Sequence, residues 1–174
     1  MKDIYAVLDI GSATLKFLVA EISSINVNIL FVKTVASHGV KKGIIEDDRI
    51  LAKDIKKLIE EAEQFLETKI TSVALTIPTI KAKLYQSDSS ISLSENGSKI
   101  TSDDIVRVLK LSSKFKRSKD EEVVSIIPVR YHSDKGATTE APLREMSRNL
   151  IVDSLIITTS KELLYPYISV VEKC

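Results

Sequence analysis

The residues whose types and spacing suggest chemistry lie near the start of the chain, where two short apolar runs flank Asp9, Gly11 and Lys16. Short apolar runs separated by a glycine predict two buried strands of a hairpin. Gly11 would permit the tight turn, because glycine adopts positive φ at no steric cost. The backbone amides of residues 11–13 would then face one concavity that suits an anion. The pattern therefore predicts a phosphate-binding turn.

Polar side chains around this turn extend the prediction. Asp9, at the end of the first strand, would hold a hydrated Mg²⁺, which prefers carboxylate, water and phosphate oxygens. Lys16 would place a positive charge beside the phosphates, and Ser12 would add an amide and a hydroxyl contact. An ordinary hairpin turn with a solvated lysine fits the same residues, so both interpretations stay open on the pattern alone. The candidate phosphate-binding residues are Asp9, Gly11, Ser12, Ala13, Thr14 and Lys16.

Composition narrows the class of protein. A length of 174 residues suits one large domain or two small ones. No segment is long and apolar enough to span a bilayer, and the N-terminal residues lack a signal-peptide pattern. The single cysteine, Cys174, cannot form an internal disulfide, which favours a cytosolic setting. The net charge of +1 argues against nucleic acid as a partner.

The first half of the chain predicts a three-stranded meander followed by a helix. The third strand, residues 27–35, would follow a turn at residues 23–26 and place Val27, Ile29 and Phe31 on one face. After a loop with two glycines, Asp47 or Asp48 would cap the helix. A buried strand over residues 72–77 would follow and end at Pro78. The apolar stripe of the helix comprises Leu51, Ile55, Leu58, Ile59, Ala62, Phe65 and Leu66.

The second half begins with a strand that would have one solvent-exposed face, with Ile80, Ala82 and Leu84 on the other face. The alternation resumes at residues 91–93. Thr101 and Asp104 approach a capping box for the next helix, whose inner face would hold Ile105, Val108, Leu109 and Ser112. The basic segment over residues 114–119 fits a solvated helix end better than a patch for an acidic partner.

The last part predicts two further strands and a helix. Pro128 lies inside a strand over residues 123–131, which indicates an edge or a bulge. A long polar loop over residues 132–149 and a strand over residues 150–159 would follow. The final helix, residues 161–174, would bury Leu164, Tyr167, Ile168 and Val171.

This order of elements predicts an α/β fold in two parts that meet at Pro78 without a flexible linker. A module of residues 81–160 would be inserted into a host made of residues 1–80 and 161–174. His38, His132 and Cys174 have no suitable companions at ligand or catalytic spacing, so no chemistry is expected of them.

Two groups of segments resemble a known family. The run from Leu8 to Ser12, with Lys16, is similar to the first phosphate loop of the actin, Hsp70 and sugar-kinase superfamily. Within it, five further segments resemble the FtsA family of bacterial division proteins. They are the Ser-x-Gly-x-x-x-Gly loop at residues 37–43 with Asp47, the helix at residues 55–67, residues 70–73, the strand and Pro-Leu pair over residues 127–143, and the strand at 152–158. The family usually has arginine in place of His38 and glycines where Arg144 and Glu145 stand.

The resemblance implies a specific architecture and role. The host would be the actin-like, ribonuclease-H-type subdomain 1A, and the insert would be the SHS2-type 1C module with order β-α-β-β. The protein would bind ATP with Mg²⁺ and show at most weak ATPase activity. It would polymerise through contacts of the 1C module with the next subunit, and link the tubulin-like FtsZ ring to the membrane at the division site.

The family continues with a second actin-like half, an FtsZ-binding surface and a membrane-docking helix, none of which this sequence contains. We therefore expect a piece of a longer protein, a split gene product or a degenerate relative, with weak ATP binding by this chain alone. Two alternatives stay open. A pilus-assembly protein like PilM shares the fold and the inserted module, and an ATP-dependent enzyme like a sugar kinase shares the Asp-Ile-Gly-Ser-x-x-x-Lys pattern.

Overall fold

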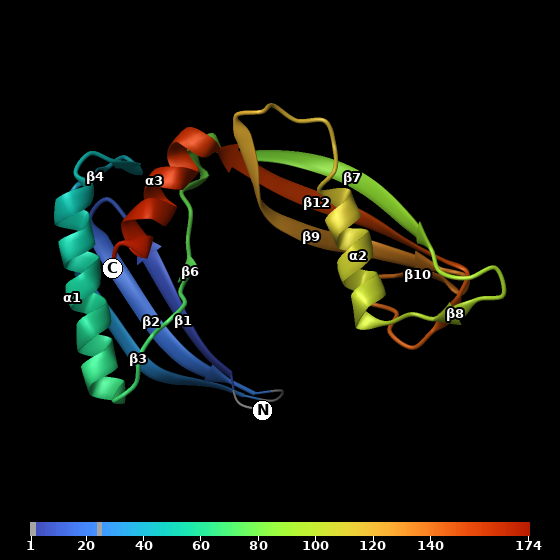
Figure 1. Cartoon of the computed structure of the whole chain (residues 1–174), viewed down its shortest axis with the longest axis horizontal. Coiled ribbons are helices and arrows are strands. Elements are labelled where there is room, and N and C mark those ends of the chain that lie inside the picture. Colours follow the sequence, from blue (N-terminus) through green and yellow to red (C-terminus); the bar gives the residue numbers. More distant parts are fainter. Residues whose placement is uncertain (1–2, 24–25) are drawn as a thin grey trace. The chain divides into compact units, whose positions relative to one another are not determined.

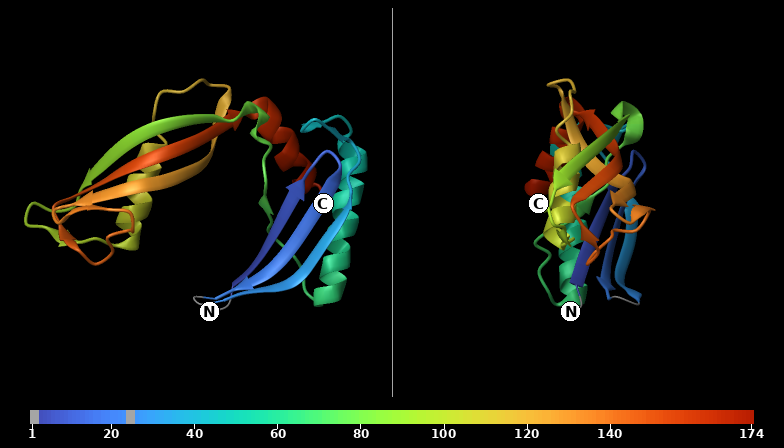
Figure 2. Two further views of the ribbon diagram at one scale, coloured as in Figure 1. Left: turned by 180° about the vertical axis from the view of Figure 1, so that it is seen from behind. Right: turned by 90° about the vertical axis from the view of Figure 1, so that its right-hand side faces the viewer.

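The computed structural model describes residues 3–23 and 26–174 (Figures 1 and 2). The turn predicted at residues 23–26 therefore lies partly outside the described residues. The chain forms two compact units, one made of Met1–Ile80 and Glu162–Cys174 and the other of Lys81–Lys161. No helix in the described part of the chain is long and apolar enough to cross a membrane.

The first unit is built on a four-stranded sheet with the order β3-β2-β1-β6. The hairpin of β1 (Asp3–Ile10) and β2 (Thr14–Ile22) confirms the predicted pair of strands. The third strand, β3 (Val27–Ala36), is antiparallel to β2, whereas β6 (Ala74–Leu75) runs parallel to β1.

Helix α1 (Asp48–Leu66) covers one face of this sheet (Figure 1). Its N-cap is Asp47, one of the two predicted candidates, whose side chain accepts hydrogen bonds from the amides of Arg49 and Ile50; Asp48 is the first residue of the helix. Phe65 is the exception to the predicted stripe, since it is 70% exposed at the end of the helix, where its ring contacts that of Phe31. Helix α3 (Lys161–Glu172) completes the core with buried Leu163, Leu164, Tyr167 and Val170, so the predicted Ile168 lies at its margin, 37% exposed.

Two strand predictions for this unit were wrong in detail. A register shift between Val19 and Ala20 adds one residue to β3, so Val27 and Ile29 are exposed while Phe31 packs on the core. A bulge of this kind breaks the two-residue alternation on which the prediction depended. The strand expected at residues 72–77 is the two-residue edge strand β6, in which no residue is buried.

The second unit is a four-stranded antiparallel sheet with the order β10-β9-β12-β7. It follows the short 3₁₀ helix η1 (Thr79–Lys81) and comprises β7 (Lys83–Ser92), β9 (Glu121–Ser133), β10 (Gly136–Thr138) and β12 (Asn149–Ser160). Helix α2 (Ser102–Ser112) lies against one face of this sheet (Figure 1), and the view from behind shows the other face without a helix (Figure 2, left). The capping box of Thr101 and Asp104 is complete, and Val108 and Ser112 are buried as predicted.

Three predictions for the second unit need correction or completion. Leu84 was expected to face inward, but it is 64% exposed, and Tyr85, Ser87 and Ile91 lie on the inner face of one continuous strand. The expected loop over residues 132–149 contains β10 and β11 (Met146–Ser147), which pairs with β8 (Ser98–Lys99). Pro128 lies beside a register shift between β9 and β12, which confirms the predicted irregularity.

Candidate functional site

The turn between β1 and β2 is closed by one backbone hydrogen bond, in which the amide of Gly11 donates to the carbonyl of Thr14 at 3.0 Å. Gly11 does not adopt the positive φ that we predicted. Glycine suits the position for another reason, because a Cβ there would lie 2.9 Å from the Thr14 carbonyl oxygen. The amide of Gly11 is therefore committed to the turn, and the amides of Ser12 and Ala13 remain as the donors for an anion.

Asp9 and Lys16 are direct cross-strand partners on the sheet face opposite the core residues Leu8 and Phe17. The Lys16 ammonium donates to Asp9 Oδ2 at 3.1 Å, and the Thr76 hydroxyl donates to Asp9 Oδ1 at 2.6 Å. The hydrogen bond from Thr76 lowers the pKa of Asp9 most; Lys16 lowers it further, while partial burial opposes both. Asp9 is therefore a fixed, ionised carboxylate, 40% exposed to solvent.

The loop after β3 supports the turn from the other side. The amide of Ser37 donates to the Ala13 carbonyl at 3.0 Å, and the amide of Gly43 donates to Ser12 Oγ at 3.0 Å. Within this loop, β4 (Val40–Lys41) and β5 (Ile44–Ile45) form a small hairpin. The Gly39 carbonyl accepts from the amides of both Glu46 and Asp47, which closes the loop onto the start of α1.

The structure brings the predicted phosphate-binding residues together around one turn. Thr14 contributes its backbone carbonyl, and Ser12 accepts from Gly43 while its own hydroxyl hydrogen can still be donated. The ammonium, the hydroxyl and the two amides can donate hydrogen bonds to a phosphate group, and the carboxylate can bind a hydrated Mg²⁺. Sequence reasoning missed Thr76, which lies 67 positions from Asp9 and carries no local motif.

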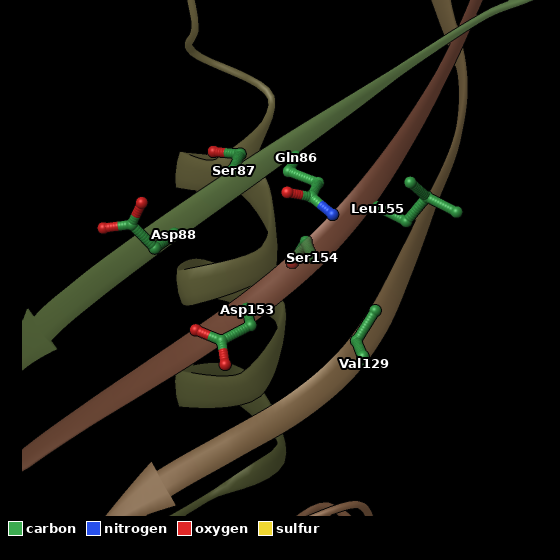
Figure 3. A pocket seen from close by; sticks show the side chains of 7 residues that line it. All are labelled: Gln86, Ser87, Asp88, Val129, Asp153, Ser154 and Leu155. Atoms are coloured by element: carbon green, nitrogen blue, oxygen red, sulfur yellow. The ribbon is translucent and has the colours of Figure 1, made fainter.

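The second unit has a hollow of about 490 Å³ on its sheet (Figure 3). Asp88 of β7 and Asp153 of β12 are directly paired there, an arrangement that is destabilising for like charges. His132 Nε2 lies 2.9 Å from Asp153 Oδ2 and so gives one of the two carboxylates a partner. In residues 3–23 and 26–174 no three potential metal-ligating side chains gather, so the hollow has no metal-binding cluster.

Both histidines have carboxylate partners that the sequence did not reveal. His38 Nδ1 lies 2.8 Å from Asp54 Oδ2 on α1, across 16 positions of sequence, and His132 pairs with Asp153 across 21. We expected two surface histidines in polar loops without companions at ligand spacing; the loop placement was wrong for His132, which lies in β9. Each pair links two elements of one unit, which is a structural role.

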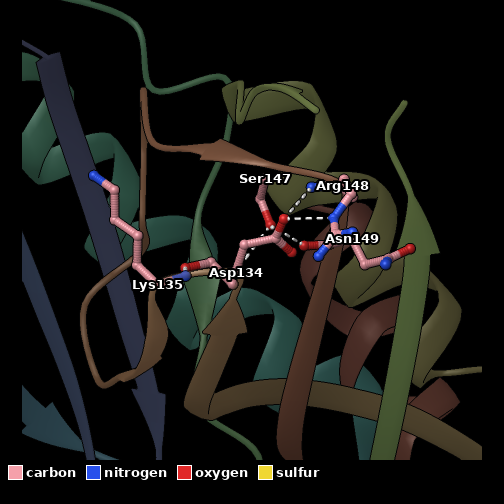
Figure 4. A network of polar contacts seen from close by, with 6 residues as sticks. Asp134, Lys135, Ser147, Arg148 and Asn149 are labelled. Atoms are coloured by element: carbon pink, nitrogen blue, oxygen red, sulfur yellow. Dashed lines mark hydrogen bonds and ion pairs between the residues drawn. The ribbon is translucent and has the colours of Figure 1, made fainter. Parts of the chain in front are cut away.

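A third polar network anchors the segment between β10 and β12 (Figure 4). The Asp134 carboxylate accepts hydrogen bonds from Ser147 Oγ and from Arg148 Nε, the latter at 2.9 Å. Ser147 Oγ also accepts from the amide of Asp134 and is 2.6 Å from the carbonyl oxygen of Asn149. These contacts lower the pKa of Asp134, with the Arg148 hydrogen bond as the main cause. The network fixes a loop rather than forming a reactive centre.

Comparison with known proteins first defines the class. Residues 81–158 match the family model described as "SHS2 domain inserted in FTSA". A chain of the solved "PilM-PilN type IV pilus biogenesis complex" aligns with a TM-score of 0.57 and 14% identity, over 97% of this chain and 44% of that chain. The fold is thus of the actin-like, ribonuclease-H type, and residues 81–158 resemble the SHS2 module inserted into it.

Curated relatives then give the particular resemblance. "Cell division protein FtsA" of Bacillus subtilis is 25% identical over 171 residues, which are 98% of this chain and 39% of that protein. The same protein of Streptococcus pneumoniae is 30% identical over 166 residues, 95% of this chain and 36% of the relative. The chain is FtsA-like along nearly its whole length, and it spans less than two-fifths of the length of these relatives.

Proposed function

We propose that this chain supplies the actin-like subdomain and the SHS2 module of an FtsA-like cell division protein. In this proposal the protein binds ATP, polymerises, and connects the FtsZ ring to the inner face of the membrane at the division site. The resemblance to FtsA over both units supports the division role. The phosphate-binding turn supports the nucleotide.

The observation that carries the nucleotide proposal is the convergence of Asp9, Lys16 and Thr76 beside the turn. A bound Mg²⁺ would supply neutralisation of the phosphate charge. Asp9 would hold the hydrated ion with a carboxylate of which Thr76 fixes one oxygen. Lys16 would contact a phosphate oxygen, and the Ser12 hydroxyl and the amides of Ser12 and Ala13 would donate hydrogen bonds to the same phosphate.

The affinity of this chain alone should be weak, because residues 3–23 and 26–174 offer one candidate phosphate-binding turn where the family resemblance implies two. A loss of about 3 kcal/mol of contact free energy weakens binding more than a hundredfold. We expect isothermal titration with MgATP to give a dissociation constant above roughly 10 µM, equivalent to about −7 kcal/mol. Asp9→Asn and Lys16→Gln should weaken it further, whereas Lys53→Gln on the exposed surface of α1 should not. Tighter binding, or equal binding by all variants, would contradict this assignment.

The proposed partners follow the family resemblance. The SHS2 module would contact the next subunit of a filament, and FtsZ and the membrane would be bound by parts of the family outside the region matched here. A fluorescent fusion made at the gene itself, so that every part of the protein it encodes is present, tests the division role in native cells. Signal at the division site would support it, and a uniform signal would contradict it.

A PilM-like role in pilus assembly is the second candidate, favoured by the structural similarity across 97% of this chain. That similarity at 14% identity concerns the fold, whereas the FtsA relatives share 24–30% identity. The same fusion experiment separates the two candidates. A pilus role predicts signal that coincides with pilus bases and persists when cell division is blocked.

A further inference from the structure

Gly43, in the turn between β4 and β5, makes contacts in three directions within the first unit. Its amide donates to Ser12 Oγ of the phosphate-binding turn at 3.0 Å. Its carbonyl accepts a hydrogen bond from the Tyr167 hydroxyl of α3 at 3.1 Å. Its α-carbon faces a third segment, since an added Cβ would lie 3.3 Å from Pro78 Cβ and 3.5 Å from Ile80 Cδ1.

Two of these three contacts involve the chain connections to the second unit. Pro78 and Ile80 directly precede Lys81, where the chain enters that unit, and α3 begins at Lys161, where the chain leaves it. One residue of the first unit thus touches the phosphate-binding turn and both connections. A shift of the turn that moves Gly43 must also alter its contacts with α3 and with residues 78–80.

The surroundings of Gly43 restrict this position to glycine and keep the Tyr167 hydroxyl as a hydrogen-bond donor. Its φ of +72° and its contact with Pro78 both disfavour any side chain. Tyr167 is fully buried, and its pKa is raised by burial and, to a lesser extent, by the charge of Asp9. The hydroxyl therefore stays protonated and remains a donor. The flanking pairs Val40–Ile45 and Lys41–Ile44 hold the hairpin together around Gly43.

We propose that Gly43 couples the phosphate-binding turn to the two connections, and that Tyr167 is a positioning residue that acts on Ser12 through Gly43. Occupation of the turn by a phosphate draws on the Ser12 hydroxyl, which alters the Ser12–Gly43 hydrogen bond. The resulting shift of Gly43 then alters its hydrogen bond with Tyr167 and its packing against residues 78–80. That a phosphate occupies the turn rests on the proposed function, whereas the contacts of Gly43 that carry the coupling are present in the chain without a ligand.

The first test needs no ligand. Tyr167→Phe removes one hydroxyl and keeps the buried ring, so the fold should persist, as a thermal melt of the variant will check. Hydrogen exchange of the Gly43 amide, followed by NMR, should accelerate about three- to tenfold, the range expected for the loss of one hydrogen bond. Tyr5→Phe, at a half-exposed position in the same unit, is the matched control and should leave Gly43 unchanged. Equal exchange of Gly43 in the wild type and Tyr167→Phe would overturn the proposal.

The second test adds millimolar MgATP to the labelled chain. In the wild type, chemical-shift changes should appear at residues 9–16, at Gly43, at residues 78–80 and along α3. In Tyr167→Phe, the changes at residues 9–16 should persist while those along α3 fall by more than half. Changes confined to residues 9–16 in the wild type would overturn the coupling. Absence of any change at residues 9–16 would overturn the proposed nucleotide site, and the exchange experiment would then decide the coupling by itself.

Discussion

Gly39 and Gly97 have nearly the same backbone conformation, with φ of +83° and +78°, but very different surroundings. A Cβ on Gly39 would lie 2.3 Å from the carbonyl oxygen of Asp47, whereas a Cβ on Gly97 would have its nearest neighbours at 3.7 Å. Substitution by alanine should therefore carry the same free-energy cost of a positive φ at both positions. Only at Gly39 does a steric clash with the backbone of Asp47 add to that cost. We expect Gly39→Ala to be much more destabilising than Gly97→Ala.

The magnitudes follow from the contacts. Left-handed backbone costs an alanine about 1–2 kcal/mol, which is the whole effect expected at Gly97. At Gly39 the clash displaces Asp47, the N-cap of α1, and a cap contributes about 0.5–2 kcal/mol. The amides of Glu46 and Asp47 also donate to the Gly39 carbonyl, and each such bond contributes about 0.5–1.5 kcal/mol. Together these contributions predict that Gly39→Ala loses about 1.5–5 kcal/mol more than Gly97→Ala.

Urea unfolding of both variants measures the difference, with the two units followed separately if they unfold in separate transitions. Hydrogen exchange of the Glu46 and Asp47 amides gives a local readout, because their acceptor moves only in Gly39→Ala. Equal losses of stability in the two variants, with unchanged exchange at Glu46 and Asp47, would refute the reasoning.

Four further predictions concern the second unit and the whole chain. Thr101→Ala should lose about 1 kcal/mol of stability in urea unfolding through loss of the capping box, while Ser102→Ala should change little; equal effects would contradict the assigned cap. Hydrogen bonds from Lys83 foremost, then from Tyr85 and Thr158, lower the pKa of Glu121, while burial opposes them. The ionised Glu121 therefore stabilises the fold above the ordinary glutamate pKa of about 4.3, and this stabilisation is lost as the pH falls through the pKa of Glu121 in the folded state. Glu121→Gln should therefore flatten the acid dependence of the urea midpoint, and an unchanged pH profile would argue against this role. Residues 81–161 expressed alone should give a cooperative thermal melt, whereas an unfolded spectrum would contradict an independent module. Light scattering should show a monomer in dilute solution, with head-to-tail association through residues 132–149 only at high concentration; a stable two-fold dimer at micromolar concentration would contradict this.

The helices and the central hairpin could be predicted because their signals are local. The stripe of α1, the Asp47 cap and the Thr101–Asp104 capping box each lie within one stretch of sequence, and the structure confirms them. The strand faces were harder to predict. In β3 a bulge shifts the alternation, and in β7 the inner face holds Tyr85 and serines while Leu84 points outward. Packing against partners far along the chain decides such faces, and a single strand does not contain that information.

The candidate site shows the same division. The turn and its residue types were apparent because Asp9, Ser12 and Lys16 lie within eight positions. The contacts that fix their geometry come from Gly43 and Thr76, which are 31 and 67 positions away from their partners. Such pairs depend on how the loop after β3 and the edge strand β6 return to the hairpin, which no local spacing specifies.

The central claim is that the turn beside Asp9 binds the phosphates of a metal–nucleotide complex. Titration of the ¹⁵N-labelled chain with millimolar ATP and a small amount of Mn²⁺, which takes the place of Mg²⁺ and broadens nearby NMR signals, tests it most directly. The account predicts selective broadening of the amides of residues 9–16, reduced by Asp9→Asn and absent with Mn²⁺ lacking ATP. Broadening centred elsewhere, for example on Asp88 and Asp153, or unchanged by Asp9→Asn, would contradict it.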